Sequence, residues 1–460
     1  MRKAIRQLTE IPGPKSRAIM GRRQAAVPRG IYHATPIVAA SARGAVVEDV
    51  DGNTYLDFAG GIGTLNVGHS APAVVDAIRG QLDQFTHTCF SVAAYENYIS
   101  LAERLAKLTP GRFPKKAMFV NSGAEGIENA VKIARCASGR PGLLCFEDAF
   151  HGRTLLTLSL TSKVHPYKAG FGPFISDTLR VPFAYCYRCA YDRSYPDCTT
   201  ACIDAIEDRF TRHADPRAIA AVVVEPVLGE GGFVVPPREY LGRLAELCRR
   251  YGILVIADEV QSGFGRTGRM FACEHYGLEP DILVAAKSLA GGLPLAAIIG
   301  RAEIMDAPGV GGLGGTFAGN PLALAAAHAV LDIFETGDLL RRAESIGERV
   351  ESRAATWAAR YDAVGEVRRL GAMVGIELVK DRASRRPAKD ETNEIIRLAC
   401  ERGVIMMPAG TFGNVIRILV PLVVSDAELD EGLDVLEGCL EAVSRPQTAA
   451  GQPRGVAPAH

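Results

Sequence analysis

The sequence of 460 residues lacks any apolar run long enough to span a membrane. Its first residues, Met1 to Arg6, are not followed by the apolar core of a secretory signal. It also lacks a charge bias, because 52 basic and 52 acidic side chains cancel, so nothing indicates nucleic acid or an anionic membrane as a partner. We therefore expect a cytoplasmic protein that acts on small molecules.

A disulfide framework is missing as well. The 11 cysteines are odd in number and spread along a long chain, which is typical of reduced thiols rather than of a small secreted fold. Four of them form a local group: Cys186, Cys189, Cys198 and Cys202. Their C-x-x-C and C-x-x-x-C spacings resemble those of ligands to zinc or an iron–sulfur cluster. A surface insertion with free thiols or a disulfide fits the same residues, so both interpretations stay open at this point.

What the sequence does contain is two short apolar runs that each end on a chemically useful residue. Residues 253–257 lead into Asp258, and residues 282–286 lead into Lys287. Unbroken aliphatic runs of this length are typical of strands buried inside a parallel sheet, whose C-terminal ends bind ligands. A lysine there can form a Schiff base with an aldehyde, and a carboxylate can keep a pyridine nitrogen protonated. The pair predicts a site for pyridoxal phosphate (PLP).

Glycine-rich loops follow both runs, at 261–268 and 288–294. An acid or a lysine at a strand end is by itself more often a solvated terminus or half of an ion pair. Loops of such small residues favour a cofactor site instead, because they let a backbone lie close to a flat cofactor.

Three motifs resemble the class III aminotransferases of PLP fold type I, and within them the bacterial 4-aminobutyrate (GABA) aminotransferases. The motifs are ADEVQSG (257–263), AKSLAGG (286–292) and GGTFAGNP (314–321). The resemblance runs from about residue 13 to about residue 440. It implies the fold, the cofactor and the reaction of that family.

The alternation of short strands and amphipathic helices predicts an α/β fold. Between residues 66 and 330, buried runs at 118–120, 143–146 and 221–224 are separated by helical segments. This order favours a large PLP-binding domain with a mainly parallel, doubly wound sheet.

A smaller α+β lobe is expected from the two ends of the chain. Residues 331–445 mix short strands with helices, and the segment 1–65 contains an Asp51-Gly52-Asn53 turn that indicates a hairpin. The last residues, 446–460, are rich in Pro, Gly, Ala and Gln and are predicted to be disordered.

Further residues are assigned to the cofactor. The string VNSGAE (120–125) lies between a strand and a helix, and a helix N-terminus attracts phosphate. Because Ser-Gly helix starts are common, the assignment depends on the resemblance. The resemblance also implies that Thr316 reaches the phosphate from the partner subunit of a homodimer. The implied cofactor-binding residues are Ser122, Gly123, Ala124, Phe150, Glu225, Asp258, Gln261, Lys287 and Thr316.

The substrate residues follow in the same way. Arg153 carries a planar guanidinium that can bind a carboxylate with two hydrogen bonds, although a surface ion pair is the ordinary alternative. Arg417 lies inside an apolar strand, where a charge is costly unless it is paired. The resemblance implies that Arg153 holds the distal carboxylate, and that Glu230 neutralises Arg417 when GABA is bound but releases it for glutamate. It places Ile62 near the substrate's carbon chain, where a plain turn is the alternative.

These residues imply transfer of the amino group of GABA, or of a close ω-amino acid, to 2-oxoglutarate, which gives succinate semialdehyde and glutamate. Lys287 would be both the attachment point and the base, and Asp258 its catalytic partner. An amino-acid racemase, or an ornithine, diaminobutyrate or 5-aminovalerate aminotransferase, shares the same first step and stays open. A metal- or redox-sensing protein built on the four cysteines is a third hypothesis. The catalysis itself requires no metal, and assembly beyond a dimer is left open.

Overall fold

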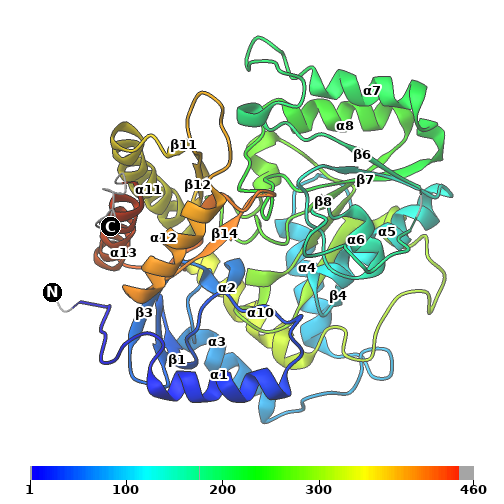
Figure 1. Ribbon diagram of the computed structural model, residues 1–460. Helices are drawn as coiled ribbons and strands as arrows, with labels where there is room; N and C mark the ends of the chain where they lie inside the picture. Colours follow the sequence, from blue (N-terminus) through cyan, green and yellow to red (C-terminus); the bar gives the residue numbers. More distant parts are fainter. Residues whose placement is uncertain (1–2, 176, 445–460) are drawn as a thin grey trace, which may run out of the picture.

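The computed structural model describes residues 3–175 and 177–444, so the tail predicted to be disordered lies outside the described residues. Figure 1 shows a large body built around one sheet, with a second group of helices and strands beside it. Among the residues described, no helix combines the length and apolar character that a membrane span needs.

The central sheet has seven strands in the order β4-β10-β9-β8-β7-β5-β6. Their bounds are Lys115–Val120 (β4), Gly142–Phe146 (β5), Thr178–Val181 (β6), Ile219–Val224 (β7), Leu254–Asp258 (β8), Ile282–Ala285 (β9) and Ala296–Arg301 (β10). Strand β10 runs antiparallel to both of its neighbours, and the pairings from β9 through β8, β7 and β5 to β6 are parallel. The predicted mainly parallel α/β sheet is confirmed.

The residues of β7 alternate between two apolar cores. Val222 and Val224 belong to the core that contains the apolar faces of α7 and α8, whereas Ala221 and Val223 belong to the core that contains the face of α5. Because successive side chains of a strand point to opposite faces, helices on both sides bury the whole strand. The helices are α5 (Gly123–Ser138), α7 (Cys202–Arg212) and α8 (Tyr240–Tyr251), of which α7 and α8 lie side by side in Figure 1.

Two four-stranded sheets complete the fold, in the orders β1-β2-β3-β13 and β11-β12-β15-β14. Their bounds are Ala39–Arg43 (β1), Val46–Asp49 (β2), Thr54–Asp57 (β3), Val404–Ile405 (β13), Val364–Leu370 (β11), Met373–Leu378 (β12), Val415–Ile418 (β15) and Met407–Ala409 (β14). Strands β2 and β3 form the predicted antiparallel hairpin, and the Asp49 carboxylate accepts the Asn53 N–H at 2.9 Å across the turn.

Strand β13 pairs in parallel with β3, with Val404 opposite Leu56. The N-terminal segment and the C-terminal part of the chain therefore share a sheet. The boundaries at residues 65, 330 and 445 stay predictions.

The remaining helices cover the sheets and carry the connections. They are α1 (Pro14–Ala26), α2 (Gly60–Gly63), α3 (Pro72–Leu82), α4 (Glu96–Leu108), α6 (Leu155–Leu160), α9 (Ala302–Met305), α10 (Pro321–Thr336), α11 (Leu339–Arg360), α12 (Lys389–Glu401) and α13 (Asp426–Ser444). Short 3₁₀ turns are η1 (Cys186–Arg188), η2 (Pro216–Ala218), η3 (Ala272–Tyr276) and η4 (Lys287–Ala290). Helix α10 begins at Pro321 because the Asn320 side chain accepts the Leu322 N–H at 3.0 Å and proline suits a first helical position.

Candidate active site

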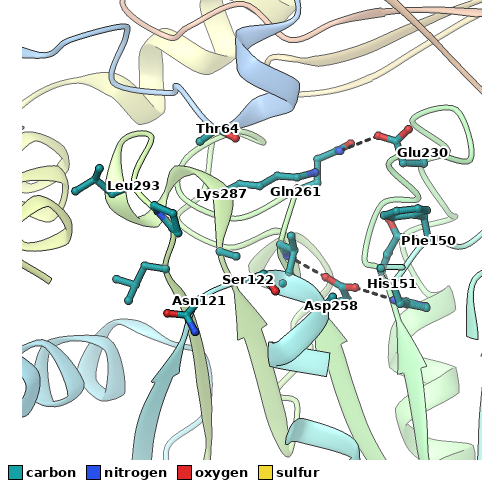
Figure 2. Close-up of a pocket in the computed structure, with 18 of the residues that line it drawn as sticks. Thr64, Asn121, Ser122, Phe150, His151, Glu230, Asp258, Gln261, Lys287 and Leu293 are labelled. Carbon is teal, nitrogen blue, oxygen red and sulfur yellow. Dashed lines mark hydrogen bonds and ion pairs between the residues drawn. The ribbon is translucent and has the colours of Figure 1, made fainter. Parts of the chain in front are cut away.

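A pocket opens at the edge of the central sheet where β4, β5, β7, β8 and β9 all end (Figure 2). These strands run in one direction, so their C-terminal ends bring together segments that are far apart in the sequence. The residues that these ends contribute are Asn121, Ser122, Phe150, His151, Glu225, Asp258 and Lys287.

Lys287 stands at the start of η4 with a left-handed backbone, φ 44°. Such a conformation is strained for a residue with a side chain and is found preferentially at functional sites. Within the described residues, its amine makes no hydrogen bond or ion pair. Burial lowers the pKa of Lys287 to about 8, with Glu230 acting in the opposite direction. This pKa gives a larger neutral fraction near physiological pH than an ordinary lysine has, which suits an amine that must act as nucleophile and base.

Asp258 ends β8 and is held from two sides. Its Oδ2 lies 2.7 Å from Nδ1 of His151, and its Oδ1 accepts the Val260 N–H at 3.1 Å. Both members of the His151–Asp258 pair are buried. His151 received no role in the sequence analysis, although its position next to Phe150 was a signal. It orients the carboxylate and supports its charge.

The N-terminus of α5 forms one wall. The Ser122 hydroxyl accepts the Glu125 N–H at 3.2 Å, and the Glu125 carboxylate accepts the Asn121 N–H at 2.8 Å. This reciprocal cap fixes the first turn, where unpaired N–H groups attract an anion. A Cβ atom on Gly123 would lie 2.9 Å from the methyl groups of Val260, so only glycine fits this close approach.

Glu225 shapes the pocket through the backbone. Its carboxylate accepts the N–H groups of Phe150 and Gly229, each at 2.8 Å. Burial raises the pKa of Glu225, and the nearby Asp258 adds to the rise. The contact fixes the position of Phe150, whose ring lines the pocket.

Glu230 and Arg417 form an ion pair at the pocket. Arg417 projects from β15 and is almost fully buried, and Gln261 Nε2 also donates to Glu230, at 3.3 Å. Burial alone would raise the pKa of Glu230, but Arg417 beside it holds that pKa below its ordinary value. Three buried polar atoms at this site have no hydrogen-bond partner within the described residues, namely Gln261 Oε1, Arg417 Nε and His151 Nε2. Such atoms indicate a place that a polar ligand fills.

The model of the class-III aminotransferase family matches residues 28–440. The chain is a class III aminotransferase. It uses pyridoxal phosphate and transfers an amino group between an amino donor and a 2-oxo acid. The predicted fold and cofactor are thereby confirmed.

Similar proteins support the assignment to the class III aminotransferases. The aminotransferase is 47% identical to the 4-aminobutyrate aminotransferase of Mycobacterium tuberculosis, over 95% of this chain and 98% of that protein. It is 48% identical to the 5-aminovalerate aminotransferase of Pseudomonas aeruginosa, over 93% of this chain and 99% of that protein. A PLP-bound amine transaminase from an uncultivated Pseudomonas species matches in structure with a TM-score of 0.83 and 33% identity, over 88% and 95% of the two chains.

The side chains that line the pocket fit PLP, independently of the comparisons with related proteins. One cavity is lined by a largely buried lysine that has no hydrogen bond or ion pair with the part of the chain that the structure describes, by a carboxylate at a strand end and by a capped helix N-terminus. These groups match an aldehyde, a pyridine nitrogen and a phosphate, respectively. The unpaired Gln261 Oε1 is a further polar atom for a ligand.

Four of the predicted site residues lie outside the lining of this pocket, and one of them, Arg417, reaches it only through its ion pair with Glu230. Arg153 is exposed, with its guanidinium 4.7 Å from the centre of the Tyr167 ring. Ile62 is 41% exposed in a left-handed turn, φ 63°. Thr316 is exposed in the loop before α10. Its predicted contact involves a second subunit. The roles of these residues, like those of the residues in the lining, stay predictions.

The four-cysteine group lines a second, smaller pocket together with Tyr185, Tyr191 and Tyr195. All eleven cysteines are free thiols, and no group of three metal-ligating side chains within the described residues is arranged to hold an ion. Burial raises the pKa of Cys186 to about 11 and that of Cys202 to about 12, so these thiols stay protonated near neutral pH. The free-thiol interpretation fits, and the metal interpretation gains no support.

Proposed function

We propose that this aminotransferase moves the amino group of 4-aminobutyrate, or of a close ω-amino acid, to 2-oxoglutarate. The products are succinate semialdehyde and glutamate. The observation that carries the proposal is the Glu230–Arg417 ion pair at the pocket. GABA has no α-carboxylate whereas glutamate has one, so a site that accepts both needs an arginine that an internal carboxylate can cover and release. The relative from M. tuberculosis, named for 4-aminobutyrate, supports the same substrate.

PLP, when bound, supplies a ring that withdraws electrons from the substrate's amino carbon. We propose that Lys287 holds it covalently, that Asp258 contacts its pyridine nitrogen with the support of His151, and that Gln261 contacts its phenolic oxygen. The helix start at Ser122, Gly123 and Ala124 would hold the phosphate, Phe150 would cover the ring, Glu225 would fix Phe150, and Thr316 would come from the partner subunit.

The protein's own residues then handle the proton and the substrate. Lys287 Nζ takes the proton from the amino-bearing carbon, which its pKa of about 8 allows near neutral pH. Arg153 binds the distal carboxylate, and Ile62 borders the carbon chain. Arg417 binds the α-carboxylate of glutamate once Glu230 has moved away.

Replacing Arg153 with alanine should raise KM for both GABA and 2-oxoglutarate. A charge-assisted bidentate contact contributes about 1.5–3 kcal/mol, which corresponds to a loss of about tenfold or more. Steady-state kinetics with each substrate varied in turn measures the effect. Arg212→Ala, at an exposed position on α7, is the matched control. If Arg153→Ala left both constants unchanged, Arg153 would be a surface arginine and the GABA proposal would lose its second carboxylate site.

Replacing Glu230 with alanine should slow the GABA half-reaction by about tenfold or more and affect the glutamate half-reaction much less. Without Glu230, Arg417 stays uncovered while GABA is bound and competes with Arg153 for its single carboxylate. Glutamate brings a carboxylate for each arginine. Single-turnover kinetics of the two half-reactions measures the split.

Glu230→Gln keeps the size of the side chain and removes its charge, so it should reproduce the selective loss. Equal losses with GABA and glutamate would make Glu230 a general structural support. A loss confined to glutamate would move the assignment towards an α-amino acid enzyme.

A second candidate donor is 5-aminovalerate, which the name of the P. aeruginosa relative favours. A panel of donors and acceptors that also follows stereochemistry separates it from GABA and separates transfer from racemisation. Ornithine and diaminobutyrate belong in the same panel.

We also propose a homodimer with shared active sites. Thr316 is exposed, and the adjacent Phe317 is 62% exposed, which is unusual for a large apolar side chain. An interface would cover both residues and bring Thr316 to the partner's pocket. Light scattering on the purified protein tests the dimer. A cytoplasmic location is part of the proposal and depends on the sequence argument alone.

A further inference from the structure

Tyr167 lies in a turn that follows α6. Its ring contacts two residues that have predicted roles in the site. Its ring packs edge-on against Phe150, with the ring centres 5.1 Å apart. The Arg153 guanidinium lies 4.7 Å from the centre of the same ring. Tyr167 is half-buried and connects the ring that lines the pocket to an arginine outside the lining.

Arg153 depends on this contact for its position. Within the described ranges, no carboxylate lies at ion-pair distance from its guanidinium, in contrast to Arg417, which Glu230 covers. A cation on an aromatic face is held in place while its edge N–H groups stay free to bind a carboxylate. Tyr167 therefore supplies order to Arg153 through its ring, and the guanidinium has further N–H groups for a carboxylate.

The charged groups that influence Tyr167 belong to the proposed substrate site. Burial raises the pKa of Tyr167 and Glu230 adds to the rise, whereas Arg153 and Arg417 lower it. Both arginines to which the substrate's carboxylates are assigned thus influence Tyr167, and Arg153 also contacts its ring.

We propose that Tyr167 is a positioning residue that fixes where the substrate's distal carboxylate binds and thereby selects the length of its carbon chain. The inference builds on the proposed function, because it takes Arg153 as the distal carboxylate site. Phe150 lies in the pocket lining, where the cofactor is assigned, and Arg153 lies outside that lining. With Tyr167 in contact with both of them, the distance between the reacting carbon and the carboxylate is set by two ring contacts rather than by a mobile arginine.

The experiment compares Tyr167→Leu, which removes the ring, with Tyr167→Phe, which keeps it. Single-turnover kinetics is measured with GABA, 5-aminovalerate, glutamate and alanine, because alanine has an α-carboxylate but no distal one. Tyr167→Leu should raise the apparent dissociation constants of GABA and glutamate about three- to tenfold and leave alanine unchanged. The ratio of the rate constants for GABA and 5-aminovalerate should move towards one. Tyr167→Phe should stay close to the wild type.

Binding of glutarate, an unreactive dicarboxylate, is followed by calorimetry and should weaken by the same factor in Tyr167→Leu only. Tyr195→Leu, at an exposed tyrosine outside the lining of the active-site pocket, is the matched control. A loss with alanine as large as that with glutamate would overturn the inference in favour of a structural role. So would equal losses in the Leu and Phe variants, or no change in either.

The experiments distinguish a failure of the proposed function from a failure of the role proposed for Tyr167. A wild-type enzyme that converts glutamate but not GABA would refute the proposed function. The comparison of glutamate with alanine would still decide the role of Tyr167 in that case.

Discussion

Turnover should vanish in Lys287→Ala. Loss of the general base alone typically costs about 10²–10⁴-fold in rate, and here the same side chain is also the predicted covalent attachment point. The geometry explains why another lysine should not take over. Lys287 lines the pocket with a strained backbone, and burial brings its pKa to about 8. Transamination assays measure the loss of rate.

A chemical readout separates this role from a general loss of structure. Borohydride reduction followed by peptide mass analysis should find PLP attached at position 287 in the wild type and no attached PLP in Lys287→Ala. Lys116→Ala, at an exposed lysine on β4, should retain both the label and the activity. A label that persisted in Lys287→Ala would disprove the assignment.

The second large effect is expected for Asp258. Asp258→Ala and Asp258→Asn should each lower the rate by roughly 10²–10³-fold, because both remove a fixed negative charge that supports charge development. Asparagine keeps the size of the side chain and can still bond His151, so it isolates the charge from the shape. The rate of a single half-reaction at saturating cofactor measures the effect.

The two variants also distinguish a role in binding from a role in catalysis. If a variant bound PLP more weakly but regained the wild-type rate with added cofactor, Asp258 would be a binding residue only. A wild-type rate in Asp258→Asn would show that the carboxylate charge is not needed.

Much of the site's framework could be predicted from the sequence. The apolar runs that end on Asp258 and Lys287 were recognisable because a strand buried on both faces leaves an unbroken aliphatic pattern. The hairpin was recognisable from its turn residues. In these segments the local pattern and the final environment agree, so short stretches of sequence were sufficient.

The contacts between segments could not be predicted in the same way. The His151–Asp258 bond joins residues 107 positions apart. It depends on the order β8-β7-β5 in the sheet, which the order along the chain does not reveal. The contact of Tyr167 with Arg153 depends on the path of an irregular turn. The cysteine spacing likewise did not determine which way the four thiols point, and that direction decides between free thiols and a metal site.

The pairing of β13 with β3 has a consequence for how the chain is made. The hairpin emerges early in synthesis, but its free edge along Leu56 has no partner until Val404 has been added. At typical rates of translation, this delay lasts roughly twenty seconds to more than a minute. During that time the nascent protein carries an open strand edge, which is a template for pairing with other chains. We therefore expect ribosome-bound fragments that end before Val404 to need protection of this edge.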